Sequence, residues 1–119
     1  MKYLTKDTRP WGSFYVIHDE PNYKLKRIEV EPSKRLSYQY HHKRSETWII
    51  VQGTGLFTLN GDDKKVSVGE TVLIPRLSKH RILNTGEDLL VIIEVQTGSY
   101  FGEDDIVRIE DDYNRHNEE

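Results

Sequence analysis

The sequence predicts an all-β fold, and three observations lead to that prediction. Short runs of β-branched and aromatic residues recur along the 119 residues and are broken by turn residues every few to a dozen positions, as in a sandwich or barrel. No segment has the periodicity of a long amphipathic helix. Asn60-Gly61 separates two strand-like runs, and Asn-Gly is the strongest short hairpin signal because both residues tolerate positive φ.

The predicted strands follow one another through short connections. The first is an aromatic and β-branched run, and the second alternates charged with apolar residues. Gly53, Gly55, Gly69 and Gly86 mark joints between them. We expect a single domain over residues 1–119, with a barrel core of about 12–97 and an acidic C-terminal extension over 98–119. The strands are expected at residues 13–18, 24–31, 36–41, 46–52, 54–59, 64–67, 71–74, 79–84 and 89–96.

Composition excludes several classes of function. The chain has no cysteine, so a thiolate metal site and a cysteine nucleophile are excluded, and any bound metal must take nitrogen and oxygen ligands. The formal net charge of -3 argues against a nucleic-acid partner. The start of the chain lacks the apolar segment of a signal peptide, and the run 89–93 is too short to cross a membrane, so we expect a cytoplasmic protein without a membrane partner.

Four ligand candidates follow from strand alternation, because residues two apart on a strand point to the same face. Gln39 and His41 share a face, Glu46 follows across a short connection, and His80 comes from a separate hairpin. Such side chains are able to converge on one divalent ion at about 2.0–2.2 Å per ligand. The donor set suits zinc first, with manganese, cobalt, nickel and iron as alternatives. His42 falls on the opposite face.

Each candidate also has a plainer interpretation. A lone histidine such as His80 is more often a hydrogen-bonded structural residue, and Glu46 alone fits a charge on the barrel rim. Their joint spacing favours the metal site. A basic cluster of Lys43, Arg44, Lys79 and Arg81 flanks these residues in sequence, which leaves a small anionic substrate open beside the alternative of a solvated rim.

The spacing of these residues resembles a known two-part motif. The two parts here are Gln39-x-His41-x4-Glu46-x6-Gly53 and Gly69-x5-Pro75-x4-His80-x3-Asn84. Together they resemble the cupin superfamily. The resemblance implies a jelly-roll β-barrel in which both motifs aim their ligands at one interior point.

A closer resemblance covers nearly the whole chain. It rests on Arg9-Pro10-Trp11-Gly12, on Leu36-Ser37-x-Gln39-x-His41-His42-x-Arg44-Ser45-Glu46-x-Trp48, and on Gly102-Glu103-Asp104-Asp105-Ile106-Val107-Arg108 with Glu110-Asp111-x-Tyr113. These stretches are similar to the type II phosphomannose isomerase domain, which commonly forms the C-terminal part of bifunctional enzymes with mannose-1-phosphate guanylyltransferase. The resemblance also accounts for Gln39, since this family tends to have Gln where other cupins have the first His.

The resemblance implies a metal-dependent isomerase that interconverts mannose 6-phosphate and fructose 6-phosphate, two small phosphorylated sugars. It implies Gln39, His41, Glu46 and His80 as metal ligands, with Glu46, His41 and Arg9 at the catalytic centre. Candidates for holding phosphate are Arg9, Lys43, Arg44, Lys79 and Arg81. A homodimer is expected through outer sheet faces, where Tyr38 and Tyr40 point outward. The chain shows no glycine-rich nucleotide loop, so we do not expect it to make GDP-mannose by itself.

Two alternatives remain open at this point. One is a non-catalytic module that binds a sugar phosphate or nucleotide sugar beside a separate guanylyltransferase, because a fold does not fix an activity. The other is a different cupin enzyme, such as an oxygenase or another sugar isomerase or epimerase. Departures from the usual motifs bear on this choice. Ser33 and Leu77 replace glycines, and Lys43 and Thr47 stand where relatives often have His; the Leu77 position is one where a turn requires positive φ.

Overall fold

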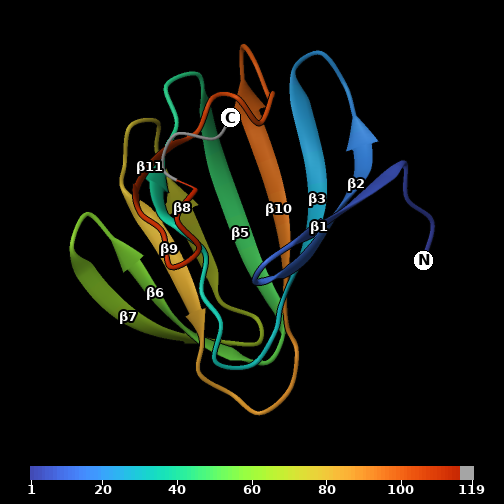
Figure 1. Cartoon of the computed structure of the whole chain (residues 1–119). Helices are drawn as coiled ribbons and strands as arrows, with labels where there is room; N and C mark the ends of the chain where they lie inside the picture. Colours follow the sequence, from blue (N-terminus) through green and yellow to red (C-terminus); the bar gives the residue numbers. More distant parts are fainter. Residues whose placement is uncertain (116–119) are drawn as a thin grey trace.

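Two antiparallel sheets face each other in the computed structural model, which describes residues 1–115 (Figure 1). The larger sheet has the spatial order β1 (Thr5–Arg9), β2 (Gly12–Asp19), β3 (Tyr23–Val30), β10 (Leu90–Gly98), β5 (Arg44–Gln52) and β8 (Thr71–Ile74). The smaller sheet has the order β11 (Val107–Glu110), β4 (Tyr38–Tyr40), β9 (His80–Asn84), β6 (Thr54–Leu59) and β7 (Asp62–Ser67). The predicted all-β jelly-roll fold is confirmed. The described residues include no helix that is long and apolar enough to span a membrane.

Two strands, β1 and β11, were not expected from the sequence. The β1 residues are polar and show no alternation, yet they pair with β2 from Thr5 opposite Val16 to Arg9 opposite Gly12. The β11 strand pairs with β4. Both are edge strands with one neighbour, so pairing to an existing sheet decides their conformation where propensity gives a weak signal. The last four residues of the predicted C-terminal extension, 116–119, lie outside the described part.

The predicted hairpin at Asn60-Gly61 is confirmed. Asn60 has φ 48° and Gly61 has φ 88°, and the flanking strands β6 and β7 pair from Leu59 opposite Asp62 outward. Two successive residues at positive φ match the twist of a two-residue hairpin connection, which explains why this dipeptide closes the turn.

The space between the sheets is apolar toward one end of the barrel and polar toward the other. Along β10 the inward residues are Leu90 and Ile92 and then Glu94 and Gln96, all buried. The antiparallel register places Gln96 opposite Glu46 on β5, so the polar ends of the strands meet. The apolar half supplies the core, at about 1.5–3 kcal/mol for each fully buried side chain.

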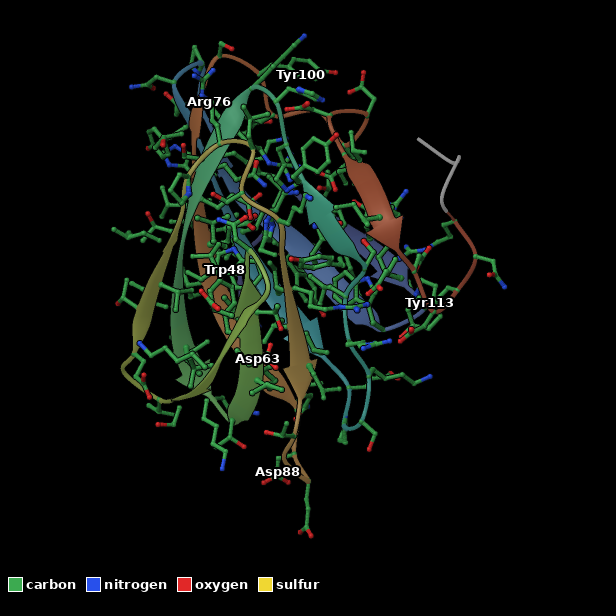
Figure 2. All side chains as sticks on the ribbon, turned by 90° about the vertical axis from the view of Figure 1, so that its left-hand side faces the viewer. Trp48, Asp63, Arg76, Asp88, Tyr100 and Tyr113 are labelled. Carbon is green, nitrogen blue, oxygen red and sulfur yellow. The ribbon has the colours of Figure 1, made fainter. Side chains whose placement is uncertain are left out.

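Trp48 marks the boundary between these halves. It is 1% exposed, and its ring packs edge-on against Phe57 at 5.6 Å. Figure 2 shows Trp48 inside the barrel, with Arg76 and Tyr100 toward one end and Asp88 at the other. Trp48 therefore separates the hydrophobic core from the polar interior.

The C-terminal segment after β10 is anchored to the barrel. Phe101 and Ile106 are buried against the barrel, whereas Tyr100 is 40% exposed and does not serve as an anchor. Tyr38 and Tyr40, which were expected to point outward, are both half-buried. The segment brings further charged side chains to the polar end of the barrel.

Candidate metal centre

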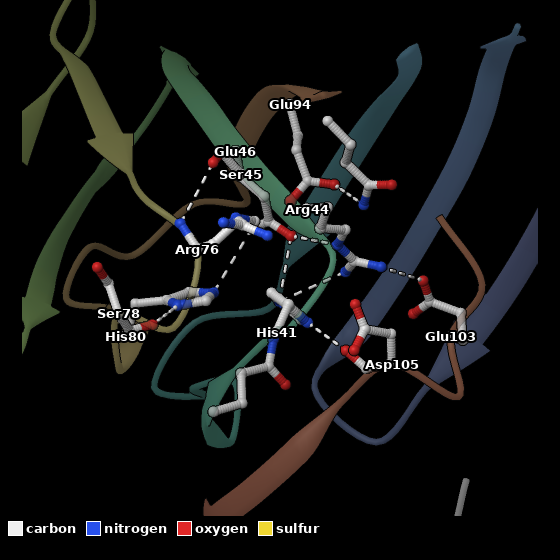
Figure 3. Close-up of polar contacts among 12 residues, drawn as sticks. His41, Arg44, Ser45, Glu46, Arg76, Ser78, His80, Glu94, Glu103 and Asp105 are labelled. Carbon is white, nitrogen blue, oxygen red and sulfur yellow. Dashed lines mark hydrogen bonds and ion pairs between the residues drawn. The ribbon is translucent and has the colours of Figure 1, made fainter. Parts of the chain in front are cut away.

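Three buried side chains from three different elements meet in the polar half of the interior. His41 follows β4, Glu46 lies on β5 and His80 begins β9, and none is more than 3% exposed. The Nε2 atom of His41 lies 3.2 Å from Glu46 Oε2, and the Nε2 atom of His80 lies 3.6 Å from Glu46 Oε1. The three side chains point toward one another in Figure 3. Spacing in the sequence therefore predicted this convergence correctly.

Backbone carbonyls orient both imidazoles. His41 Nδ1 lies 2.7 Å from the Asp105 carbonyl oxygen, and His80 Nδ1 lies 2.9 Å from the Ser78 carbonyl oxygen. Each Nδ1 must carry the proton that it donates, so Nε2 is the ring nitrogen that faces Glu46; it donates to this carboxylate when the ring is protonated and offers a lone pair to a metal ion when the ring is neutral. The buried Nε2 of His80 has no hydrogen-bond partner among the described residues. This is the arrangement that a metal-ligating histidine requires.

Glu46 is ionised in this setting. Burial alone would raise its pKa, but His41, His80 and Arg44 outweigh the burial and hold the pKa of Glu46 well below its usual range. The indole Nε1 of Trp48 also donates to Glu46 Oε1 at 3.2 Å. A carboxylate kept negative in a buried site is an effective oxygen ligand for a cation.

Arg44 lies inside the barrel. It is 3% exposed, and its Nε donates to Glu46 Oε2 at 2.8 Å, while one of its terminal nitrogens contacts His41 Nε2 at 3.4 Å. Burial lowers the pKa of Arg44, but Glu46, Glu94 and Glu103 more than offset this and raise the pKa above its ordinary value. Arg44 thus neutralises the charge of Glu46 and lines the same pocket.

A second buried carboxylate, Glu94, lies beside Glu46. It accepts hydrogen bonds from Trp48 Nε1 at 2.8 Å and from Gln96 Nε2 at 2.7 Å. Burial and the neighbouring charge of Glu46 raise the pKa of Glu94 to about 8. The two carboxyl groups share the Trp48 indole, and the raised pKa of Glu94 favours its protonated form beside the ionised Glu46.

The residues present fit a divalent ion. His41, Glu46 and His80 offer ligand atoms that all lie within 4.8 Å of one another. Two imidazole nitrogens and one carboxylate oxygen form a donor set that zinc and other first-row transition metals accept. Gln39, the fourth expected ligand, lies directly opposite His80 in the β4–β9 pair, and its Oε1 accepts a hydrogen bond from Ser37 Oγ at 2.7 Å. Its role as a ligand stays a prediction.

A pocket of about 50 Å³ reaches down to Glu46. Four candidates named from the sequence line this pocket: Arg9, Gln39, Arg44 and Glu46.

Other phosphate-binding candidates lie elsewhere. Lys43 is exposed, with its ammonium over the Tyr100 ring, and Lys79 is exposed directly before β9. Arg81 alternates with the inward His80 and therefore lies on the outer side of its sheet, where it donates to the Leu36 carbonyl and pairs with Glu110. These three side chains are not brought together with the pocket.

The sequence interpretation missed several charged residues of the site. Lys26 is 3% exposed, lines the pocket and pairs with Glu103 at 2.8 Å. The period-two pattern contained a signal for it, because Lys26 shares a face with the buried Ile28 and Val30. Glu94 had the same signal in β10. No such signal marked Glu103, Arg108 and Arg115. These residues reach the pocket only because the C-terminal segment after β10 folds back against the barrel.

The departures from the usual motifs lie where glycine is favoured. Leu77 has φ 70° and Ser33 has φ 68°, so both adopt the left-handed conformation. The turn before His80 nevertheless closes, with the Leu77 amide donating to the His41 carbonyl at 2.9 Å. Asn84, the last motif residue, is buried and donates to the Val30 and Asp88 carbonyls. Asn84 secures a loop and stays away from the ligand cluster.

The sequence matches known proteins along most of its length. A family model described as mannose-6-phosphate isomerase C-terminal matches residues 1–111. The mannose-1-phosphate guanylyltransferase ManC of Salmonella typhimurium is 45% identical over 107 residues, which cover 90% of this chain and 22% of that protein. The alginate biosynthesis protein AlgA of Pseudomonas aeruginosa is 46% identical, with the same coverage of 90% and 22%. The chain therefore spans about a fifth of the length of these curated relatives.

Solved structures agree with the fold. The capsular polysaccharide assembling protein CapF of Staphylococcus aureus superposes with a TM-score of 0.79 at 24% identity, over 90% of this chain and 34% of that one. A putative sugar phosphate isomerase from Acidithiobacillus ferrooxidans gives a TM-score of 0.59 at 27% identity, over 64% and 50%. A double-stranded β-helix protein of Klebsiella pneumoniae gives 0.69 at 16% identity, over 74% and 77%. The likeness to the first and third of these concerns the fold alone.

Proposed function

Because the chain belongs to the mannose-6-phosphate isomerase C-terminal family, we propose that it interconverts mannose 6-phosphate and fructose 6-phosphate with the help of one divalent metal ion. The observation that carries this proposal is the buried cluster of His41, Glu46 and His80 beside a cation-lined pocket. The name of the structural relative from Acidithiobacillus ferrooxidans, a putative sugar phosphate isomerase, supports the same class of reaction.

The cluster supplies what such a reaction needs. Moving a proton between C1 and C2 of a sugar develops negative charge on the oxygens of those carbons, and a bound divalent ion would stabilise that charge as a Lewis acid. His41, Glu46 and His80 would hold the ion, with Gln39 as a fourth ligand. Glu46 is then committed as a ligand and does not act as the free base. Arg44 adds positive charge at the same end of the pocket and keeps Glu46 ionised.

The guanylyltransferase reaction for which ManC of Salmonella typhimurium is named is not part of this proposal. This chain covers about a fifth of the length of that protein, and the matched region is the isomerase domain. A non-catalytic role in binding a sugar phosphate is the rival, and the test below separates the two.

A coupled assay tests the proposal directly. Fructose 6-phosphate formed from mannose 6-phosphate is measured on protein loaded separately with zinc, manganese, cobalt or nickel, and on a chelated control. We expect metal-dependent turnover that falls at least 100-fold in His80→Ala and persists in His18→Ala. His18 is the matched control because it is exposed and pairs with Tyr23 away from the pocket.

Two outcomes would overturn the proposal. Absence of turnover with every metal, together with binding of mannose 6-phosphate, favours the binding module. Iron-dependent oxygen consumption without isomerisation favours an oxygenase.

A further inference from the structure

Two buried cations share one carboxylate at the wall of the pocket. Lys26 Nζ donates to Glu103 Oε2 at 2.8 Å, and a terminal nitrogen of Arg44 reaches the same oxygen at 3.5 Å. All three residues line the pocket. The side chains of Lys26 and Arg44 are 4% and 3% exposed, whereas that of Glu103 is 35% exposed. The cations therefore lie inside the barrel, and their anionic partner approaches them from its surface.

The larger sheet supports both cations independently of Glu103. Lys26 lies on β3, and its ammonium packs over the Phe14 ring at 4.3 Å. Arg44 begins β5, and its Nε donates to Glu46 Oε2 at 2.8 Å. Contacts of this kind hold a positive group in place without a further partner. Lys26 and Arg44 thus remain positioned when Glu103 moves away.

Glu103 lies in a turn whose two ends are anchored. The Asp105 amide donates to the Gly102 carbonyl at 3.1 Å, which closes a four-residue turn with Glu103 at its second position. Phe101, directly before the turn, is buried, and so is Asp105 at its end. The Glu103 side chain is therefore able to rotate toward solvent while the backbone on both sides stays attached to the barrel.

The pocket is too small for a sugar phosphate while all of its lining stays in place. Its volume is about 50 Å³, whereas small-molecule sites typically measure about 300–1,000 Å³. A lining side chain must therefore move before a hexose phosphate enters. Three carboxylates line the pocket among the described residues, and two of them, Glu46 and Glu94, are only 3% exposed. Glu103 is the lining carboxylate that reaches solvent.

Resting on the isomerase function proposed above, we propose that Lys26 and Arg44 form the subsite for the phosphomonoester group of the substrate, and that Glu103 closes this subsite until the phosphate displaces it. A phosphomonoester carries about −1.5 to −2 charges at pH 7 and three acceptor oxygens, so it competes well with one carboxylate for two cations. Charge-assisted bonds from a guanidinium to phosphate are about 2.7–2.9 Å long, which is closer than the contact between Arg44 and Glu103.

The orientation of Arg44 fits the length of the substrate. Its Nε and one terminal nitrogen face Glu46 and His41, and the other terminal nitrogen faces Glu103. Figure 3 shows the Arg44 guanidinium between the carboxylates of Glu46 and Glu103. The reacting carbons C1 and C2 and the phosphate on C6 lie at opposite ends of the hexose. Arg44 separates the candidate metal cluster from the position of Glu103 in the same sense.

Calorimetric titration tests the subsite without requiring turnover. The ligands are inorganic phosphate, mannitol 1-phosphate and mannitol. Mannitol 1-phosphate is an open-chain hexose phosphate that lacks the carbonyl needed for isomerisation, and mannitol is its phosphate-free counterpart. Each ligand is titrated into the full chain, into Lys26→Met and Glu103→Gln, and into the matched controls Lys65→Met and Glu29→Gln. Lys65 is exposed, Glu29 pairs with Arg27, and neither lines the pocket.

The two variants should shift phosphate affinity in opposite directions. We expect both phosphate ligands to bind about 10-fold more weakly to Lys26→Met and about 10-fold more tightly to Glu103→Gln. The double variant should lose the tighter binding, because removal of Glu103 has no effect without the cation that it covers. Mannitol should show no change, and the control variants should match the wild type. A damaged fold does not explain tighter binding by Glu103→Gln.

The outcomes distinguish this subsite from the isomerase proposal. Unchanged or weaker phosphate binding in Glu103→Gln, or unchanged binding in Lys26→Met, would overturn the subsite even if the coupled assay shows turnover. The expected shifts in a chain without turnover would support the subsite and overturn the isomerase proposal. A wild type and a Glu103→Gln variant that bind neither phosphate ligand contradict both. Circular dichroism of Lys26→Met, together with retained binding in the charge-conserving Lys26→Arg, excludes misfolding as the cause of a loss.

Discussion

The Nδ1 atom of His41 lies 2.7 Å from the backbone carbonyl oxygen of Asp105. The carboxylate of the same aspartate accepts hydrogen bonds from the backbone amides of His42 at 3.0 Å and Lys43 at 2.9 Å. One residue of the C-terminal segment thus holds both the ring of the candidate ligand His41 and the backbone that follows it. The orientation of His41 depends on a segment more than 60 residues away in sequence.

Truncation of Asp105 tests this dependence. Asp105→Ala removes two acceptors from backbone amides and should lower the free energy of unfolding by about 1–3 kcal/mol. Because the segment then no longer fixes the His41 ring, zinc affinity should fall about 10-fold or more. Urea unfolding and a competitive chelator titration measure the two effects. The neighbouring exposed Asp104→Ala is the control, and equal zinc affinity in both variants would show that the segment does not orient the ligand.

Replacement of Leu77 by glycine should stabilise the protein. Leu77 is 56% exposed and has φ 70°, a conformation that costs a non-glycine residue about 1–2 kcal/mol. Glycine removes this cost, but it also raises the conformational entropy of the unfolded chain, which offsets part of the effect. We therefore expect the free energy of unfolding to rise by about 1 kcal/mol. Zinc stoichiometry should not change.

The matched control for this change is Leu73→Gly. Leu73 is 66% exposed and lies within β8, where glycine weakens a strand. The two substitutions should therefore shift the urea midpoint in opposite directions. A decrease in both would mean that the Leu77 turn carries no strain.

Glu103 should contribute to the loss of folding stability at acid pH. Burial raises its pKa, but Lys26 and Arg44 outweigh this and hold the pKa of Glu103 below its ordinary value of 4.5. A carboxyl whose pKa is lower in the folded state stabilises the fold above its unfolded pKa, and this contribution disappears as the pH falls through the folded pKa. Glu103→Gln should therefore be less stable than the wild type at pH 7, with the difference shrinking below about pH 4.5.

Urea unfolding midpoints between pH 7 and pH 3 check this prediction. At neutral pH the loss should be about 1–3 kcal/mol, because Lys26 keeps its buried charge without its carboxylate partner. A constant difference between wild type and Glu103→Gln across the whole range would contradict the assigned ion pairs.

Side-chain alternation in the sequence predicted much of the fold and the convergence of His41, Glu46 and His80, because strands bury every second residue and the spacing of these residues follows from this. The same alternation places Arg44 on the face of Glu46 and Trp48, and Arg81 on the face away from His80. Charge alone had grouped Arg44 and Arg81 together. Strand alternation therefore indicates which of the two arginines faces the barrel interior, and distance in sequence from the candidate ligands does not.

The remaining features depend on tertiary pairing. Nothing in the five polar residues of β1 indicates a strand, since the sheet edge offered by β2 determines their conformation. Arg108 reaches the pocket because β11 pairs with β4, and the Asp105 carbonyl reaches His41 through the same return of the chain. Such contacts join residues more than 60 positions apart, and no local pattern records them.

The measurement that tests the central claim most directly is the metal content of the protein. Zinc per chain is determined by plasma mass spectrometry after loading and gel filtration, on the wild type, His80→Ala, Glu46→Gln and the control His18→Ala. We predict one zinc per chain in the wild type and in His18→Ala, and less than a tenth of that in the other two variants, each shown by circular dichroism to be folded. Retention of one zinc per chain in both His80→Ala and Glu46→Gln would contradict a metal centre at His41, Glu46 and His80.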